Sequence, residues 1–167
     1  VALEKATTIT VTISGTINNQ WISWDDFSIR AVDTQVKMSI SDAKYSTFIA
    51  PFDVEIPEGV TASKITGVKG NVLTEETVEG TIPANTPVVL YSEAPVSQTF
   101  SGQSLATADA YTVGLLTGTY VDYQTTANTN TYALQNHDGK VAFYLVGESA
   151  QPWIRANHCY MVYEAAA

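Results

Sequence analysis

Residues 82–91 read IPANTPVVLY, and residues 154–163 read IRANHCYMVY. Placed in register, the two segments carry identical residues at Ile82/Ile154, Ala84/Ala156, Asn85/Asn157 and Tyr91/Tyr163. Asparagine tolerates a left-handed backbone and its side chain can bond nearby amides, so Ile-x-Ala-Asn predicts a corner that turns the chain into a strand. Neither copy brings a paired acid, base or metal cluster. We therefore favour one structural corner used twice over a repeated site, and expect residues 87–91 and 159–163 to be equivalent central strands of two related halves.

The remainder of the chain alternates apolar and polar residues with the period of two that is typical of β-strands. Strands are expected at residues 36–40, 45–52, 62–68, 72–78, 132–135 and 140–146, with turns every ~8–12 residues, a spacing that suits a sandwich. Asp138-Gly139 is the best hairpin signal, whereas residues 95–110 are expected to be loose. The sequence thus predicts an all-β fold, an antiparallel β-sandwich or sandwich-like barrel with a weak internal two-fold repeat.

The chain divides most naturally near residues 31–35, where a strand-like segment gives way to a charged turn. Residues 1–34 are expected to form a β-hairpin segment, the end of a preceding β-sandwich module, and residues 35–167 a β-sandwich accessory module. The sequence opens at VALEK with neither an initiator methionine nor a signal peptide. We expect it to be a piece of a longer precursor.

The composition limits the classes of partner. Hydrophobic residues make up 45% of the 167 residues and charged residues only 15%, below the ~25% usual in globular domains, and this profile is typical of extracellular β-proteins. A net charge of -9 without a basic cluster argues against nucleic acid. No apolar stretch approaches the ~20 residues that span a bilayer. The single cysteine, Cys159, excludes an internal disulfide.

Four segments carry a resemblance to a known class of module: YSTFIAPFDVEIPEGVTASKIT (45–66), GTIPANTPVVLY (80–91), YALQNHDGKVAFYLV (132–146) and WIRANHCYMVY (153–163). Together they resemble the C-terminal β-rich accessory module of secreted and surface proteins of Bacteroidetes. The resemblance implies a non-catalytic domain appended to carbohydrate-active or adhesive partners. TITVTISGTINNQWISWDDFSI (8–29) is similar to the last strands of a galactose-binding-type jelly roll.

Aromatic residues are the strongest functional lead, because the C–H faces of sugars stack on aromatic rings while neighbouring polar groups bond the hydroxyls. The predicted ligand-binding residues are Trp153, Arg155, Trp24, Trp21, Tyr120 and Tyr123. Alternation places Trp21 and Trp24 on opposite faces of their strand, and both could equally be structural. If either Ile-x-Ala-Asn corner touches a ligand, the second is expected to, with Trp153 and Arg155 at its rim.

Catalytic and metal chemistry find little support. Adjacent strand residues such as His158 and Cys159 point to opposite faces and cannot form a nucleophile–base pair. The pairs Glu55/Glu58 and Glu75/Glu76 are expected to be solvated charges beside turns or on open strands. No cofactor is expected, although Asp25, Asp26, Asp33, Asp42 and Asp53 could supply oxygen ligands to a structural Ca²⁺.

The sequence therefore predicts a non-catalytic, secreted or cell-surface carbohydrate-binding module of a larger carbohydrate-active protein. Its expected partners are a polysaccharide or glycan and neighbouring domains of the same precursor. The alternative is a structural or adhesin-type module that binds another protein through exposed edge strands and binds no glycan.

Overall fold

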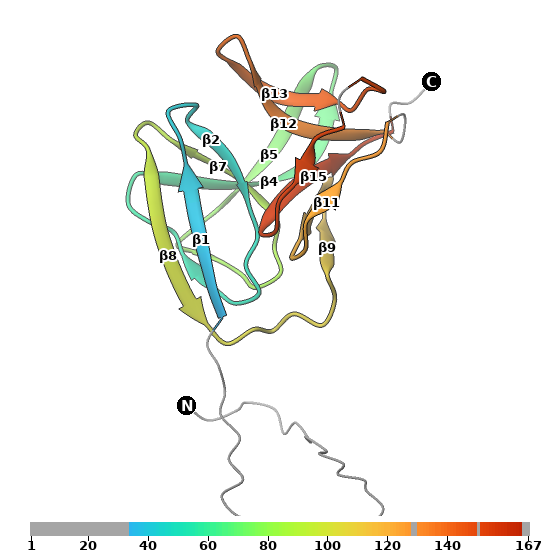
Figure 1. Cartoon of the computed structure of the whole chain (residues 1–167). Helices are drawn as coiled ribbons and strands as arrows, with labels where there is room; N and C mark the ends of the chain where they lie inside the picture. The colour runs from blue at the N-terminus through green and yellow to red at the C-terminus, as the bar shows by residue number, and fades with distance from the viewer. Residues whose placement is uncertain (1–33, 128–129, 150, 165–167) are drawn as a thin grey trace, which may run out of the picture. The chain divides into compact units, whose positions relative to one another are not determined.

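The computed structural model describes residues 34–127, 130–149 and 151–164. Every regular element among them is a β-strand, and all strand pairs are antiparallel (Figure 1). The strands are β1 (Thr34–Ile40), β2 (Tyr45–Phe48), β3 (Val54–Glu55), β4 (Val60–Lys69), β5 (Val72–Val78), β6 (Thr81–Ile82), β7 (Val88–Ser92), β8 (Val96–Gly102), β9 (Ala110–Val113), β10 (Leu116–Thr119), β11 (Tyr123–Gln124), β12 (Thr131–His137), β13 (Lys140–Leu145), β14 (Trp153–Ile154) and β15 (His158–Val162). The all-β sandwich predicted from the alternation is confirmed.

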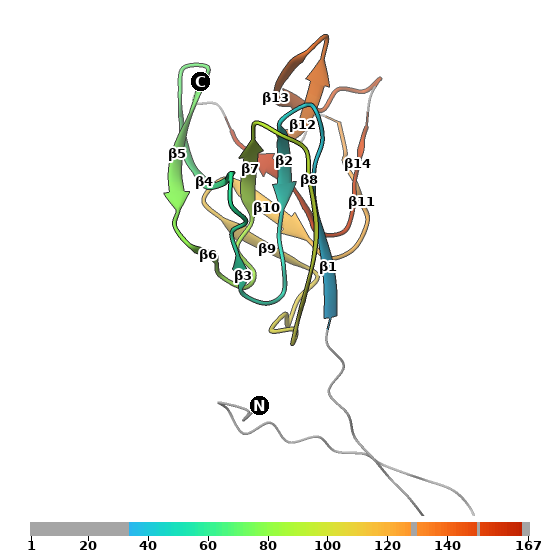
Figure 2. The ribbon, with the colours of Figure 1, turned by 90° about the vertical axis from the view of Figure 1, so that its left-hand side faces the viewer.

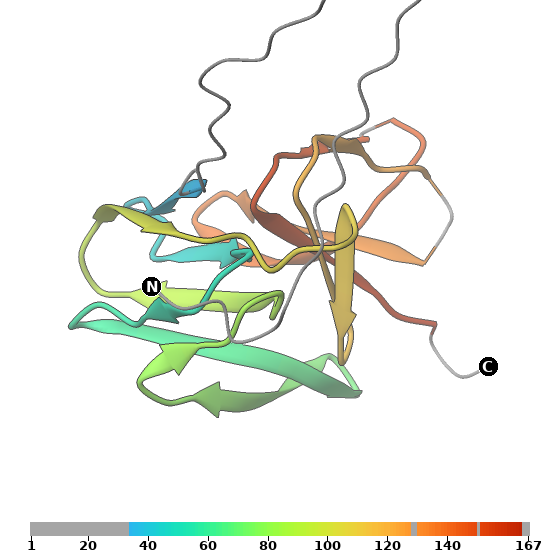
Figure 3. The ribbon, with the colours of Figure 1, turned by 90° about the horizontal axis from the view of Figure 1, so that it is seen from below.

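Two larger sheets build the sandwich: a four-stranded sheet in the order β2-β7-β4-β5 and a five-stranded sheet in the order β13-β12-β15-β10-β9. Two-stranded ladders β1-β8, β3-β6 and β11-β14 complete it. Figure 3 shows the green strands of the first sheet beside the orange and red strands of the second. In Figure 2, β5 is the outer strand of its sheet.

Local sequence explains the strands and their turns. In β1, Val36, Met38 and Ile40 are buried while the residues between them are exposed, as a strand with one face on a core requires. The β12-β13 hairpin turns at Asp138 and Gly139, which have φ angles of 53° and 84°, as a type I′ turn demands. The hairpin predicted from Asp-Gly is confirmed.

The expectation of a loose segment at residues 95–110 is wrong for its first part. Residues 96–102 form β8, which pairs along its whole length with β1. Val96 and Phe100 pack against the core cluster that includes Val36 and Met38. The alternation of β8 was hard to recognise because most residues between and beside them are Ser, Gln and Thr. The strand forms because β1 supplies hydrogen-bonding partners from a distant part of the sequence.

The internal repeat is visible in the pairing registers. β7 lies between β2 and β4, and β15 lies between β10 and β12, so both are central strands as predicted. The shared Ile-x-Ala-Asn makes Val89 equivalent to Met161. Ser63 pairs with Val89 and Tyr132 pairs with Met161, so Ser63 and Tyr132 are equivalent too. On the other side, Phe48 opposite Val88 corresponds to Thr117 opposite Tyr160. The two halves therefore share one strand register on both sides of the central strand.

The two corners are built alike. Asn85 and Asn157 both adopt left-handed backbone, with φ angles of 61° and 66°. Ahead of each, an alanine N–H donates to an aspartate, Ala84 to Asp53 Oδ1 at 2.7 Å and Ala156 to Asp122 Oδ1 at 3.0 Å. The short pairs β3-β6 and β11-β14 occupy matching positions beside them. The corner is a structural device used twice, in which Asp53 and Asp122 have the same role.

The two halves meet through β2, β10 and β15. Thr47 Oγ1 accepts from the Cys159 N–H at 2.9 Å, and Asn157 Nδ2 donates to the Ile49 carbonyl at 3.2 Å. Gly118 of β10 lies directly against Ile49, which leaves no room for a Cβ. The contact of these halves positions the groove described below.

The predicted hairpin segment at residues 1–34 lies outside the described residues except for Thr34, as do Trp21, Trp24, Asp25, Asp26 and Asp33. The division of the chain near residue 34 therefore stays a prediction. Within the described ranges there is no helix long and apolar enough to cross a membrane.

Candidate functional site

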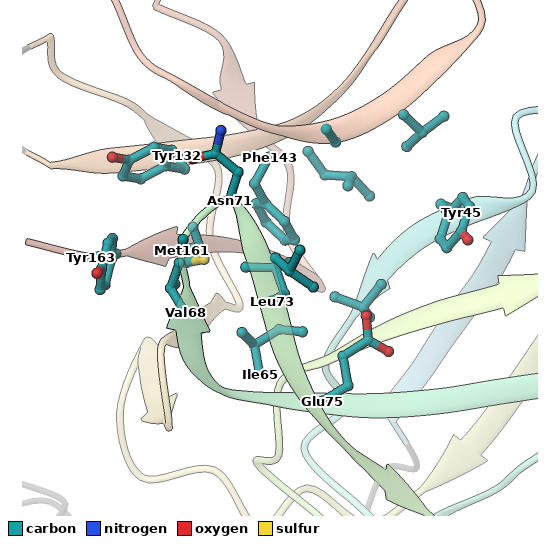
Figure 4. A pocket seen from close by; sticks show the side chains of 16 residues that line it. Tyr45, Ile65, Val68, Asn71, Leu73, Glu75, Tyr132, Phe143, Met161 and Tyr163 are labelled. Atoms are coloured by element: carbon teal, nitrogen blue, oxygen red, sulfur yellow. The ribbon is translucent and has the colours of Figure 1, made fainter. Parts of the chain in front are cut away.

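An open groove of about 570 Å³ lies between the β4-β5 hairpin of the first sheet and the β12-β13 hairpin of the second (Figure 4). This volume is within the range of small-molecule and cofactor pockets, roughly 300–1,000 Å³. Aromatic rings from four separate segments of the chain line it: Tyr45, Tyr132, Phe143 and Tyr163, the last directly after β15. An aromatic groove of this size is a candidate ligand site.

The floor of the groove is core that neither hairpin covers. Ile65, Val89 and Met161 are buried and belong to the cluster that joins the two halves, and they also line the groove. Val89 and Met161 occupy equivalent positions of the repeat. The groove thus lies where equivalent strands of the two halves face one another, and its apolar floor continues the core.

The hairpins form the walls through their inward faces. On β12-β13, Leu134 lies opposite Phe143, and on β4-β5 the corresponding pair is Ile65 opposite Glu75. Phe143 and Glu75 therefore occupy equivalent positions of the repeat, one a ring and the other a carboxylate. A repeat with similar backbones but different side chains gives the groove two chemically distinct walls.

Tyr45 stands at one end of the groove in Figure 4 and is 43% exposed. Its ring packs on Tyr91, with centroids 4.9 Å apart. Tyr91 donates to Glu93, which also forms an ion pair with Lys44. The hydrogen bond from Lys44, and then that from Tyr91, lower the pKa of the Glu93 carboxyl. These contacts fix Tyr91 as a supporting ring for Tyr45, which stays partly exposed.

The far end of the groove in Figure 4 is formed by Tyr132, Tyr163 and Asn71. Asn71 lies in the tight turn between β4 and β5, next to Gly70, whose φ angle is 60°. The groove therefore offers rings at both ends, an amide at one and the Glu75 carboxylate near the other. Rings with a few polar groups at the rim can hold a ligand that has one apolar face and hydroxyl edges.

The structure places the predicted residues Trp153 and Arg155 together at the second corner, away from the groove lining. Trp153 is 52% exposed on β14, as expected of a residue at a rim. Arg155 Nη1 donates to Asp122 Oδ2 at 2.7 Å. The hydrogen bond from the Ala156 N–H, and then that from Arg155, lower the pKa of Asp122. Arg155 thus supports the corner that Asp122 builds.

Tyr120 and Tyr123 are engaged in packing. The Tyr120 hydroxyl donates to Asn85 Oδ1 at 2.8 Å, and burial raises the pKa of Tyr120. Its ring also borders a smaller hollow of about 400 Å³ beside residues 104–109. Tyr123 stacks on Tyr160 with ring centroids 5.0 Å apart. None of the four predicted residues in the described part of the chain lines the groove: Trp153, Arg155, Tyr120 and Tyr123.

Cys159 and the possible metal ligands bear on catalytic and metal chemistry. Cys159 is buried, its thiol donates to the Phe48 carbonyl at 3.2 Å, and burial raises its pKa to about 12. Such a thiol stays protonated at neutral pH and is a poor nucleophile. Across residues 34–127, 130–149 and 151–164, no group of three or more His, Cys, Asp or Glu side chains is arranged to hold a metal ion.

Comparison with known proteins adds no assignment: no protein-family model, curated protein or solved structure matches this chain. The resemblance to the Bacteroidetes accessory module therefore stays a prediction.

Sequence reasoning missed the groove residues because it weighted tryptophan and loop position. Tyr132 and Phe143 belong to segments that were predicted as strands, and alternation places them on the same face of the β12-β13 hairpin. That signal was available. The opposing wall, with Glu75 and Leu73, is placed by the contact between the two halves, which no local pattern reports.

Proposed function

We propose that the chain is a non-catalytic carbohydrate-binding module that holds a glycan in the groove between the β4-β5 and β12-β13 hairpins. The observation that supports this proposal is the gathering of Tyr45, Tyr132, Phe143 and Tyr163 around an open groove with only a few polar groups at its rim. Pyranose rings present apolar C–H faces that stack on aromatic rings and hydroxyl edges that bond amides and carboxylates. The parent protein is proposed to be secreted or cell-surface and carbohydrate-active.

The test replaces Phe143 with leucine, which keeps an apolar side chain on the groove wall and removes the ring. Loss of the ring contact is expected to weaken glycan binding about fivefold to twelvefold, from about 1–1.5 kcal/mol of stacking. Affinity electrophoresis against plant and host polysaccharides measures this, followed by calorimetry with the best ligand.

The adjacent Tyr144→Leu is the matched control, because Tyr144 projects from the opposite face of β13 and stacks on His137 with centroids 4.0 Å apart. It should leave glycan affinity unchanged. Trp153→Ala tests the site predicted from the sequence. If Trp153→Ala abolishes binding and Phe143→Leu does not, the ligand lies at the second corner and the groove assignment is wrong.

The alternative is a structural or adhesin-type module. The observation that favours it is that β5 and β13 each lie at one edge of their sheets, and every residue of β5 except Leu73 and Val78 is exposed. An exposed edge can accept a strand from another protein. No glycan binding across the whole panel, together with a partner that is lost when proline replaces Thr74 on this edge, would favour the alternative.

A further inference from the structure

Glu75 is the one charged residue among those that line the groove in the described part of the chain. No hydrogen bond or ion pair engages its carboxylate within those residues. The neighbouring Glu76 differs: it projects from the other face of β5 and pairs with Lys64 at 2.9 Å. One of two adjacent glutamates is therefore neutralised by a lysine, and the one at the groove is not.

An unpaired carboxylate at a groove rim accepts hydrogen bonds from hydroxyl and ammonium donors and offers none in return at neutral pH. It also repels carboxylate and sulfate groups. No lysine or arginine lines the groove to offset it among the residues described, and the net charge of -9 adds to the repulsion. The charge at the groove thus selects among ligands.

We propose that Glu75 is the specificity-determining residue of the groove: it favours glycans that present hydroxyl or amino donors and rejects glycans that carry carboxylate or sulfate groups. This inference rests on the proposed glycan-binding function. In the repeat, Glu75 and Phe143 are equivalent positions on facing hairpins, and both line the same groove (Figure 4). A sugar can therefore stack on Phe143 through its C–H face while its polar edge reaches Glu75.

The experiment compares three oligosaccharides of matched length by calorimetry on the full chain: a neutral cello-oligosaccharide, a cationic chitosan oligosaccharide and an anionic oligogalacturonate. The wild type is expected to bind the neutral or the cationic probe and to bind the anionic probe more weakly. Glu75→Gln should strengthen binding of the anionic probe about threefold to tenfold and weaken binding of the cationic probe by a similar factor. Added salt should reduce both effects.

Glu76→Gln is the control, since it removes the same charge one residue away on the opposite face. Equal changes in Glu75→Gln and Glu76→Gln would show that net charge, and not the groove carboxylate, discriminates between the probes, which overturns the inference. Equal binding of all three probes by the wild type would overturn it as well, while leaving the proposed function standing. Absence of binding to every probe and to the polysaccharide panel would instead overturn the proposed function.

Discussion

Gly118 is the position where the two halves of the repeat can be tested most directly. A Cβ at this glycine would lie 2.7 Å from Ile49 Cδ1 and 2.9 Å from its Cβ and Cγ2, closer than carbon atoms pack. Gly118→Ala therefore forces Ile49 or β10 to move. Overpacking of this kind costs about 1–3 kcal/mol, and the smaller entropy of the unfolded alanine chain offsets about 0.4–1 kcal/mol.

The net expectation is a loss of about 1–2 kcal/mol in the free energy of unfolding, measured by urea denaturation of the full chain with an unchanged slope. Ile49→Ala should cost about 2–4 kcal/mol alone because it leaves a cavity. Ile49→Ala also removes two of the three close contacts with a Cβ at residue 118. The double variant should therefore lose less unfolding free energy than the sum of the two single losses, by about 1 kcal/mol or more. Strict additivity, or a Gly118→Ala variant as stable as the wild type, would refute the close contact between the halves.

Two further predictions concern the second corner. Asn157 has a φ angle of 66°, so Asn157→Ala should destabilise the chain more than Asn157→Gly by about 1–2 kcal/mol, the cost of left-handed backbone for a residue with a Cβ; equal losses in urea denaturation would contradict this. Burial lowers the pKa of His158 from 6.5, so the unfolded chain binds the proton first as pH falls. The stability due to neutral His158 is therefore complete above pH 6.5 and is lost as pH falls toward its folded pKa. His158→Gln should flatten the fall in stability just below pH 6.5, and an unchanged pH profile would argue against a partly buried, neutral imidazole.

The fold followed from the sequence where local rules are strong. Asp138-Gly139 can form a type I′ turn with little strain, and alternation then sets which residues of β12 and β13 share a face. The shared Ile-x-Ala-Asn predicted both corners because asparagine tolerates the left-handed backbone that each requires. β8 was missed because its polar residues hide the alternation, and only its pairing with β1 makes it a strand.

The candidate site depends on contacts that no local pattern encodes. Extending the β2 and β10 registers makes Gly114 the position equivalent to Tyr45, and a Cβ at Gly114 would overlap the Ile65 carbonyl oxygen. Gly114 lies in the turn between β9 and β10, so the repeat carries a ring at this position in one half, while the position must stay bare in the other. Trp153 is exposed on β14 and does not line the groove. Tyr123 stacks on Tyr160 and does not line it either.

By itself, the sequence determined the strands with clear alternation, the two equivalent corners and the absence of an internal disulfide, because each can be read from local pattern or composition. Tertiary structure alone decided that Phe143 and Glu75 line one groove while Glu76 is paired with Lys64 on the other face. The physical reason is that the groove is the uncovered edge of the core where the two halves meet, and that meeting is set by long-range contacts such as Ile49 against Gly118.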